Sequence, residues 1–240
     1  MPVPDPALPP TRAERLKRAT HETHERLDQR IMAQRIFESR ERFAAFLRVQ
    51  HRLHQHVDSL YAAPALQPLL PDLPARRRLE GISRDLSDLQ SPLPAPVPVL
   101  PATLPLPTAL GWLYVAEGSA LGGAVIYRLA APLGVDRAFG ARHLAPPAGG
   151  VAAHWRRFTT ALNAIALPAA DERHVEDGAR AAFAAVGRFV TEEFPLTTPL
   201  MSTWIYPAAR VNRSIRPGPS SHTGCCWWWT RCRCGYRNAP

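Results

Sequence analysis

Hydrophobic residues recur along most of the chain at the three- and four-residue spacing of helices that are buried on one side. The first such segment spans residues 12–32, and Thr11 and Glu14 at its start have the spacing of a capping box. Its apolar face is formed by Leu16, Thr20, Leu27 and Ile31. The same period predicts further helices at 39–62, 74–89, 108–133, 151–165 and 169–194, with Asp171 as a cap for the last.

No segment shows the alternating pattern of a strand, so the sequence predicts an all-α domain of about six helices over residues 11–195. Residues 1–10 are rich in proline and predict a flexible lead. Seven prolines between 92 and 107 exclude a helix interior there and predict an extended connection on the surface.

Residues 196–240 depart from this pattern. They hold six arginines, no acidic residue and all four cysteines, and they lack an amphipathic period. We predict an irregular, disordered basic tail, whose cysteines are either incidental or ligands of a soft metal. Without the tail the net charge falls from +9 to +3, so neither nucleic acid nor a membrane is an expected partner.

The start of the chain has no apolar signal core, and no apolar run has the length of a membrane span. The 46% hydrophobic content is that of an ordinary globular core. We therefore expect a soluble cytoplasmic protein.

The segment GWLYVAEGSALGGAVIYR, residues 111–128, has a helical pattern with three glycines in its centre. Each of Gly118, Gly122 and Gly123 weakens a helix interior by about 1 kcal/mol relative to alanine and favours a kink. One interpretation is a seam of small residues that packs on another helix. The other is a bent helix whose backbone lies over a large planar ligand.

His24 lies on the apolar face of the first predicted helix, whereas His21 points about 60° toward the polar side. A histidine in this position is most often a core residue. Its combination with a glycine-rich helix favours a second interpretation, because neutral imidazole is a common ligand of haem iron and glycines leave space for a porphyrin.

Two motifs resemble the heme oxygenase family. LKRATHETHE, residues 16–25, is similar to the proximal-helix signature Leu-Lys-x-x-Thr-x-x-x-His, which contains Thr20 and makes His24 the iron ligand. EGSALGG, residues 117–123, is similar to the distal-helix signature of bacterial members. The resemblance covers residues 12–194 and implies haem held between a proximal helix and a kinked distal helix.

The resemblance implies that haem is both cofactor and substrate. With O₂ and electrons from a ferredoxin or a flavin reductase, the reaction gives biliverdin, CO and ferrous iron. The product supplies bile pigment, for example to a bacterial phytochrome, or the reaction releases iron. A non-catalytic haem carrier or sensor of the same fold is the alternative, and a helical interaction module without haem is the third.

Candidate residues follow on both sides of the haem. Asp28, one turn after His24, is placed to accept a hydrogen bond from the second ring nitrogen, although the family often has glutamate there. On the distal side the three glycines bring backbone to the haem face. Ser119 either holds water for proton delivery or bonds its own backbone. Glu117 is interpreted as structural.

Haem propionates require cations. Lys17 matches a basic position of the proximal motif, and Arg128 matches one that follows the distal glycines in bacterial relatives. Arg156 and Arg157 are weaker candidates. His51 and His54, three residues apart, have the spacing of a metal pair, but without a nearby carboxylate we interpret them as surface histidines.

Overall fold

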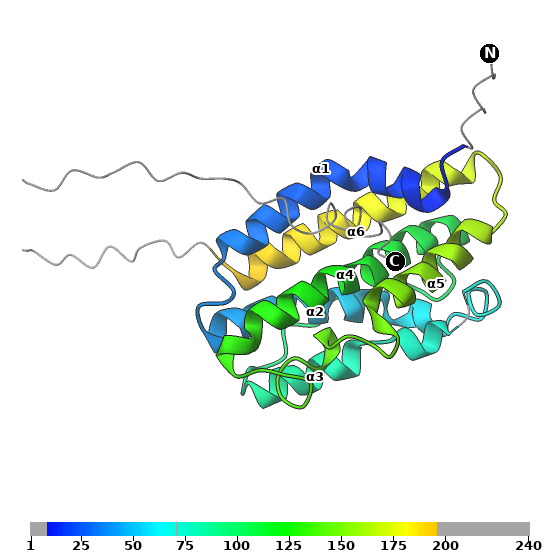
Figure 1. Cartoon of the computed structure of the whole chain (residues 1–240). Coiled ribbons are helices and arrows are strands. Elements are labelled where there is room, and N and C mark those ends of the chain that lie inside the picture. The colour runs from blue at the N-terminus through cyan, green and yellow to red at the C-terminus, as the bar shows by residue number, and fades with distance from the viewer. Residues whose placement is uncertain (1–8, 71, 196–240) are drawn as a thin grey trace, which may run out of the picture. The chain divides into compact units, whose positions relative to one another are not determined.

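The computed structural model describes residues 9–70 and 72–195 (Figure 1). The α-helices are α1 (Arg12–Ala33), α2 (Arg40–Val57), α3 (Leu79–Asp88), α4 (Leu106–Ala130), α5 (Gly150–Ala164) and α6 (Asp171–Glu193). Short 3₁₀ helices are η1 (Asp58–Ala62), η2 (Leu73–Arg76), η3 (Ala131–Leu133) and η4 (Arg142–Leu144). The predicted all-α class is confirmed. The predicted tail, and all of the predicted lead except residues 9 and 10, lie outside the described residues.

The two predicted helix caps have different outcomes. At the start of α1, the Thr11 side chain accepts a hydrogen bond from the Glu14 backbone N–H, and the Glu14 carboxylate accepts one from the Thr11 N–H at 2.9 Å. The capping box is confirmed. The prediction that Asp171 caps the last helix is wrong, because Ala170 is the N-cap and Asp171 lies in the first turn of α6. There its charge still favours the helix dipole.

Two predicted helices are each divided. The predicted segment 39–62 is α2 followed by η1, and the predicted segment 74–89 is η2 followed by α3. The second division occurs at Arg76, whose side chain is 3% exposed and bonds Glu117 of α4. Arg76 and Glu117 are 41 residues apart in sequence, so their contact does not affect the local spacing of apolar residues. That spacing therefore could not predict that the segment divides into η2 and α3.

The backbones of α4 and α6 cross almost in contact. A Cβ atom at Gly111 would lie closer than 3.0 Å to the Val175 carbonyl oxygen, and one at Gly178 would lie equally close to the Thr108 carbonyl oxygen. Only glycine permits this approach on both helices. Gly111, which precedes the three central glycines of the segment 111–128, therefore serves as a packing contact with α6.

Helix α1 packs on α6 from another side, so that α6 lies between α1 and α4 (Figure 1). Arg12 pairs with Glu172 at 2.8 Å near the start of both helices. Arg30 donates to the Thr191 hydroxyl at 2.8 Å near their ends. The two helices consequently run in the same direction.

Helix α4 is the central apolar helix of the domain. Together with η3 it is long and apolar enough to cross a membrane by length and composition, but 78% of its apolar window is buried inside the domain, as in a core helix. The α-helix continues without interruption through Gly118, Gly122 and Gly123. The three glycines predict a bend, but they do not interrupt the α-helix.

The proline-rich connection before α4 is extended, as predicted, from Ser91 to Leu100. Every third residue of its middle part, at positions 94, 97 and 100, is half-buried while its neighbours are exposed, which is the period of polyproline II. The Leu100 N–H donates to the His56 carbonyl at 2.8 Å, and the Val97 N–H donates to the Gln55 side chain at 3.1 Å. The connection thus lies against the end of α2.

We predict that Gly178→Ala destabilises the domain. In an exposed helix this change stabilises by about 1 kcal/mol, but here the new methyl group meets the Thr108 carbonyl. Overpacking against backbone costs typically about 1–3 kcal/mol, or roughly 2–10 °C in Tm for a domain of this size. Thermal unfolding followed by circular dichroism at 222 nm measures the change.

Gly187→Ala, on the same helix, is the matched control, since the nearest atom to its Cβ would be the flexible end of Arg30 at 3.4 Å. Its Tm should be unchanged or slightly higher. Equal losses of Tm in the two variants would contradict the backbone crossing described above.

Candidate functional site

His24 projects from α1 toward α6. Its side chain is 21% exposed, and its ring meets Phe183 edge-on with 5.6 Å between ring centroids. His21, by contrast, is 51% exposed and lies 3.4 Å from the Glu25 carboxylate on the outer side of the same helix. The structure therefore distinguishes the two histidines as the helical pattern predicted.

The expected contact between His24 and Asp28 is present. His24 Nδ1 lies 3.0 Å from Asp28 Oδ2, and the carboxylate is 19% exposed. Burial raises the pKa of Asp28, whereas the hydrogen bond from His24 acts in the opposite direction. With Nδ1–H directed at Asp28, the neutral ring carries its lone pair on Nε2, the tautomer that a metal ion requires.

Two other residues of the proximal motif differ in their surroundings. Thr20 is 3% exposed, and its hydroxyl donates to the Leu16 carbonyl at 2.8 Å. Thr20 is therefore a buried packing residue of α1, and its hydroxyl hydrogen is already donated to the backbone of the same helix. Lys17 lies on the exposed side of α1, one turn before His21.

On α4, two of the three predicted glycines lie in line with the glycine that touches α6. At 100° per residue, Gly118 and Gly122 fall within about 20° of Gly111 around the helix. The side of α4 that touches α6 at Gly111 therefore also carries Gly118 and Gly122, with the buried Val115 about 20° from Gly122, and this side is called the glycine face.

The third glycine, Gly123, lies elsewhere. A Cβ there would lie 3.2 Å from Leu144 of η4, so this glycine provides room for packing. Ser119 is half-buried, and its hydroxyl donates to the Ala116 carbonyl at 2.7 Å. Local backbone bonding, one of the two roles expected of Ser119, is thus observed.

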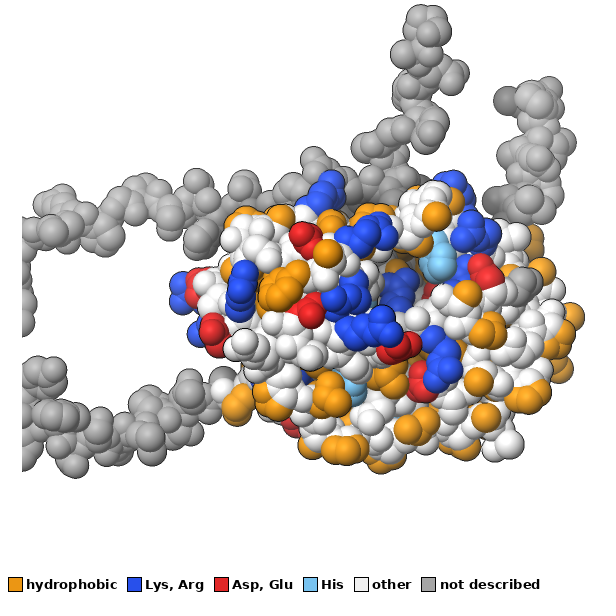
Figure 2. All heavy atoms as spheres, turned by 90° about the horizontal axis from the view of Figure 1, so that it is seen from below, with side chains coloured by type: hydrophobic (Ala, Val, Ile, Leu, Met, Phe, Trp, Pro, Cys, Tyr) orange, Lys and Arg blue, Asp and Glu red, His pale blue; other side chains and the backbone are white. Residues whose placement is uncertain are grey.

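The three candidate arginines differ in their contacts. Arg128 is exposed in the last turn of α4. Arg156 and Arg157 lie on α5, where Arg157 approaches Asp72 at 3.8 Å. Figure 2 shows that basic side chains on one face of the molecule lie beside acidic ones, so this face is not a surface of a single charge.

A buried polar network lies along α4 at Glu117, which is 1% exposed. Tyr61 of η1 donates to Oε1 at 2.8 Å, Arg76 of η2 donates to Oε2 at 2.8 Å, and His154 Nε2 of α5 lies 3.6 Å from Oε2. Burial alone would raise the pKa of Glu117, but His154 and the neighbouring arginines, Arg76 among them, hold it at about 2. The structural role expected for Glu117 therefore has three partners that the sequence did not indicate.

The interpretation of His51 and His54 as surface residues is wrong, since they are 5% and 2% exposed. His51 Nε2 lies 3.2 Å from the Ser83 hydroxyl, and burial lowers the pKa of His54 to about 3. Helix α2 is covered by α3, α4 and α6, and His54 lies about 20° from the buried Phe43 around this helix, on its apolar side. Within residues 9–70 and 72–195, no three His, Cys, Asp or Glu side chains form a group that could hold a metal ion, so the alternative of a metal pair gains no support.

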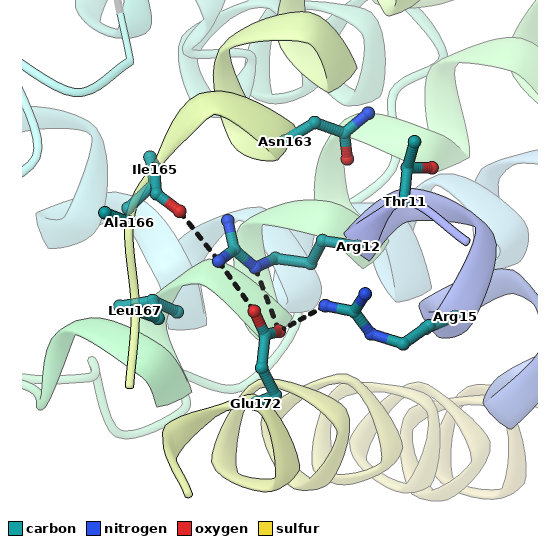
Figure 3. Close-up of a pocket in the computed structure, with 8 residues that line it drawn as sticks. All are labelled: Thr11, Arg12, Arg15, Asn163, Ile165, Ala166, Leu167 and Glu172. Carbon is teal, nitrogen blue, oxygen red and sulfur yellow. Dashed lines mark hydrogen bonds and ion pairs between the residues drawn. The ribbon is translucent and has the colours of Figure 1, made fainter. Parts of the chain in front are cut away.

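A pocket opens at the amino end of α1 (Figure 3). Arg12, which is 6% exposed, binds Glu172 and the Ile165 carbonyl there, and Arg15 binds Glu172 from the other side. The pocket lies about 14–18 Å along α1 from His24, by the helical rise of 1.5 Å per residue. It is therefore separate from the candidate haem site, and its charged residues tie α1 to α6.

The chain is similar to known proteins over the whole helical domain. A model of the heme oxygenase family matches residues 11–192. Heme oxygenase PigA of Pseudomonas aeruginosa is 40% identical over 184 residues, which cover 76% of this chain and 93% of that protein.

Two solved structures show the same fold. The heme oxygenase of Neisseria meningitidis, solved with NO and CO bound, has 36% identity and a TM-score of 0.73, with 79% of this chain and 94% of that one covered. The heme oxygenase of Leptospira interrogans has 15% identity and a TM-score of 0.62, with 76% and 100% covered, and supports the fold alone. On the match to the family and the identity to PigA, the chain belongs to the heme oxygenase family.

Proposed function

We propose that this protein cleaves haem oxidatively to biliverdin, CO and ferrous iron. Beside membership of the family, the observation that carries the proposal is the pairing of His24 with Asp28 on the side of α1 that faces α6. A haem carrier or sensor would use the same histidine. Nothing in the described contacts favours that alternative, and product analysis separates the two.

The residues fit a haem. A hydrogen bond from Nδ1–H of His24 to Asp28 would orient the ring and select the tautomer whose Nε2 can bind iron. The glycine face of α4 begins at the same part of α6. Phe183, the neighbour of His24, lies five residues after Gly178, about 7.5 Å along α6. Gly118 lies seven residues after Gly111, about 10.5 Å along α4.

Bound haem would supply the iron that activates O₂ and the macrocycle that is oxidised. The chain would supply the rest. His24 and Asp28 hold the proximal side, and Gly118 and Gly122 bring backbone, rather than an acid or an imidazole, to the distal side. Backbone at this place would present no side-chain acid or base to the O₂ that reacts there.

Ser119 would take part as an acceptor of hydrogen bonds. Its hydrogen is directed at the Ala116 carbonyl, so its lone pairs can accept from water while it delivers no proton itself. Lys17 and Arg128 are proposed to bind the haem propionates, and Thr20 to support the proximal helix. Gly123, which faces Leu144, would help α4 pack instead of touching haem.

We expect the protein to work in the cytoplasm with a ferredoxin or a flavin reductase as electron donor. The biliverdin would pass to an acceptor such as a bacterial phytochrome, or the iron would be used. The direct test is haem titration, then reduction with ascorbate or a ferredoxin system under O₂, then identification of the products. Loss of the Soret band with formation of biliverdin supports an oxygenase. A stable haem complex supports a carrier.

We predict that His24→Ala abolishes the histidine-ligated haem spectrum. Biliverdin formation should fall by more than about 100-fold, because changes at groups that merely support a ligand already cost about 10–100-fold. His21→Ala is the matched control and should retain most activity, since His21 lies on the exposed side of α1. The opposite result for the two variants would place the ligand one turn earlier.

We predict that Gly122→Leu harms turnover more than folding. A side chain on the glycine face would enter the space for O₂ or displace α4, while leucine in place of glycine favours a helix by roughly 0.5–1 kcal/mol. Melting of the haem-free variant and its biliverdin yield are measured together. A destabilised variant with normal turnover would show that Gly122 is only a packing seam.

We predict that a chain ending at Phe194 keeps haem affinity and turnover close to those of the full-length protein. The match to the family ends at residue 192, and α6 ends at Glu193. Haem titration and biliverdin yield on the two proteins, side by side, check this. A severalfold loss of either would assign residues 195–240 a part in the site.

A further inference from the structure

Glu117 is a buried carboxylate directly before the glycine segment of α4. Its two oxygens meet groups from three separate elements, namely Tyr61 of η1, Arg76 of η2 and His154 of α5. Within α4 it is the only charged residue other than Arg128 at the far end. The carboxylate is therefore the charged anchor of α4 nearest to Gly118.

The position of α4 is fixed at two points before the glycines. At the first, the Gly111 backbone lies on α6. At the second, six residues or about 9 Å further on, Glu117 is held from a direction about 120° around the helix. Two contacts at different heights and on different sides fix both the axial position and the rotation of a helix.

The position of residues 118–123 depends strongly on the contacts at Gly111 and Glu117. Gly118 and Gly122 have no side chain with which to hold their own position. The Ser119 hydroxyl donates to the Ala116 carbonyl of its own helix. The backbone at Gly118 and Gly122 consequently depends for its position on the residues on either side, which are Glu117 before it and Gly123, packed near Leu144 of η4, after it.

The partner of Glu117 is itself held firmly. Arg76 also bonds Asp72 at 2.8 Å and the His154 carbonyl at 3.2 Å, and its guanidinium lies 5.6 Å from the centre of the Phe158 ring. A buried ion pair adds little net stability compared with apolar packing, and its best-attested use is to fix one register among several. With an apolar residue at position 117, α4 could pack at more than one rotation about its axis. The Glu117 carboxylate must meet its donors Tyr61 and Arg76, which allows one rotation only.

We propose that Glu117 is a positioning residue, which sets the height and rotation of the backbone at Gly118 and Gly122 against the haem held by His24. This inference rests on the proposed function. The Glu117 side chain faces η1, η2 and α5, and in this proposal it touches neither haem nor O₂. Its effect on the reaction passes through the backbone that follows it.

The first measurement uses the full-length protein without haem. Hydrogen exchange followed by mass spectrometry compares Glu117→Gln with the wild type over residues 118–126 and over 16–28. We expect exchange in 118–126 to become about tenfold faster, with 16–28 unchanged. Glu193→Gln is the matched control, because Glu193 is a carboxylate that pairs with Arg48 and Arg52 and so joins α6 to α2.

The second measurement uses the haem complex of the same proteins. The infrared band of CO on ferrous haem reports the distal surroundings, and the hydrogen peroxide released per biliverdin reports loss of coupling. We expect Glu117→Gln to shift or broaden the CO band and to raise the peroxide severalfold, while Glu193→Gln leaves both as in the wild type. A role limited to stability would lower Tm and leave the CO band in place.

Two outcomes overturn the proposal. One is exchange in 118–126 that rises no more in Glu117→Gln than in Glu193→Gln, and the other is an unmoved CO band. If Glu117→Gln does not fold, Tyr61→Phe, which removes only the donor to Oε1, replaces it with the same criteria. A wild type that binds haem but makes no biliverdin would instead refute the proposed function, and the exchange result would still stand.

Discussion

The contact of two backbones at Gly111 and Gly178 determines how the helices of this domain can be arranged. Because neither residue has a side chain, α4 and α6 approach each other more closely than any other pair of residues would allow. The N-terminal half of α4 is thereby fixed to α6, and it carries the rest of the helix with it. The distal side of the candidate site is thus an extension of a packing contact.

The proximal side depends on the same helix. Polar contacts at both ends fix α1 to α6, Arg12 with Glu172 near the start and Arg30 with Thr191 near the finish. Between them His24 lies against Phe183. Helix α6, which carries none of the predicted ligands, is therefore the reference on which both halves of the site are aligned.

Local features of the fold and the site were predictable from the sequence because they arise within one helix. The capping box of α1 and the bond between His24 and Asp28 each follow from a spacing of three or four residues. Buried charges were not predictable in this way. Arg76 meets Glu117 over 41 residues, and Arg12 meets the Ile165 carbonyl over 153, so nothing near either arginine in sequence marks it as buried. The error at His51 and His54 has another cause. His54 lies about 20° from the buried Phe43 around α2, and His51 lies about 40° from the buried Leu47, so the apolar spacing of this helix already placed both on or beside its buried side.

The proline-rich connection between α3 and α4 has a consequence for the unfolded chain. Each proline fixes its own φ near −65° and restricts the residue before it, so most of residues 91–100 can adopt few conformations even without the folded domain. Folding then removes less conformational entropy from this connection than from an ordinary loop of equal length. The prolines before α4 therefore contribute to the stability of the domain by lowering the conformational entropy of the unfolded chain. This contribution does not correspond to any contact in the folded structure.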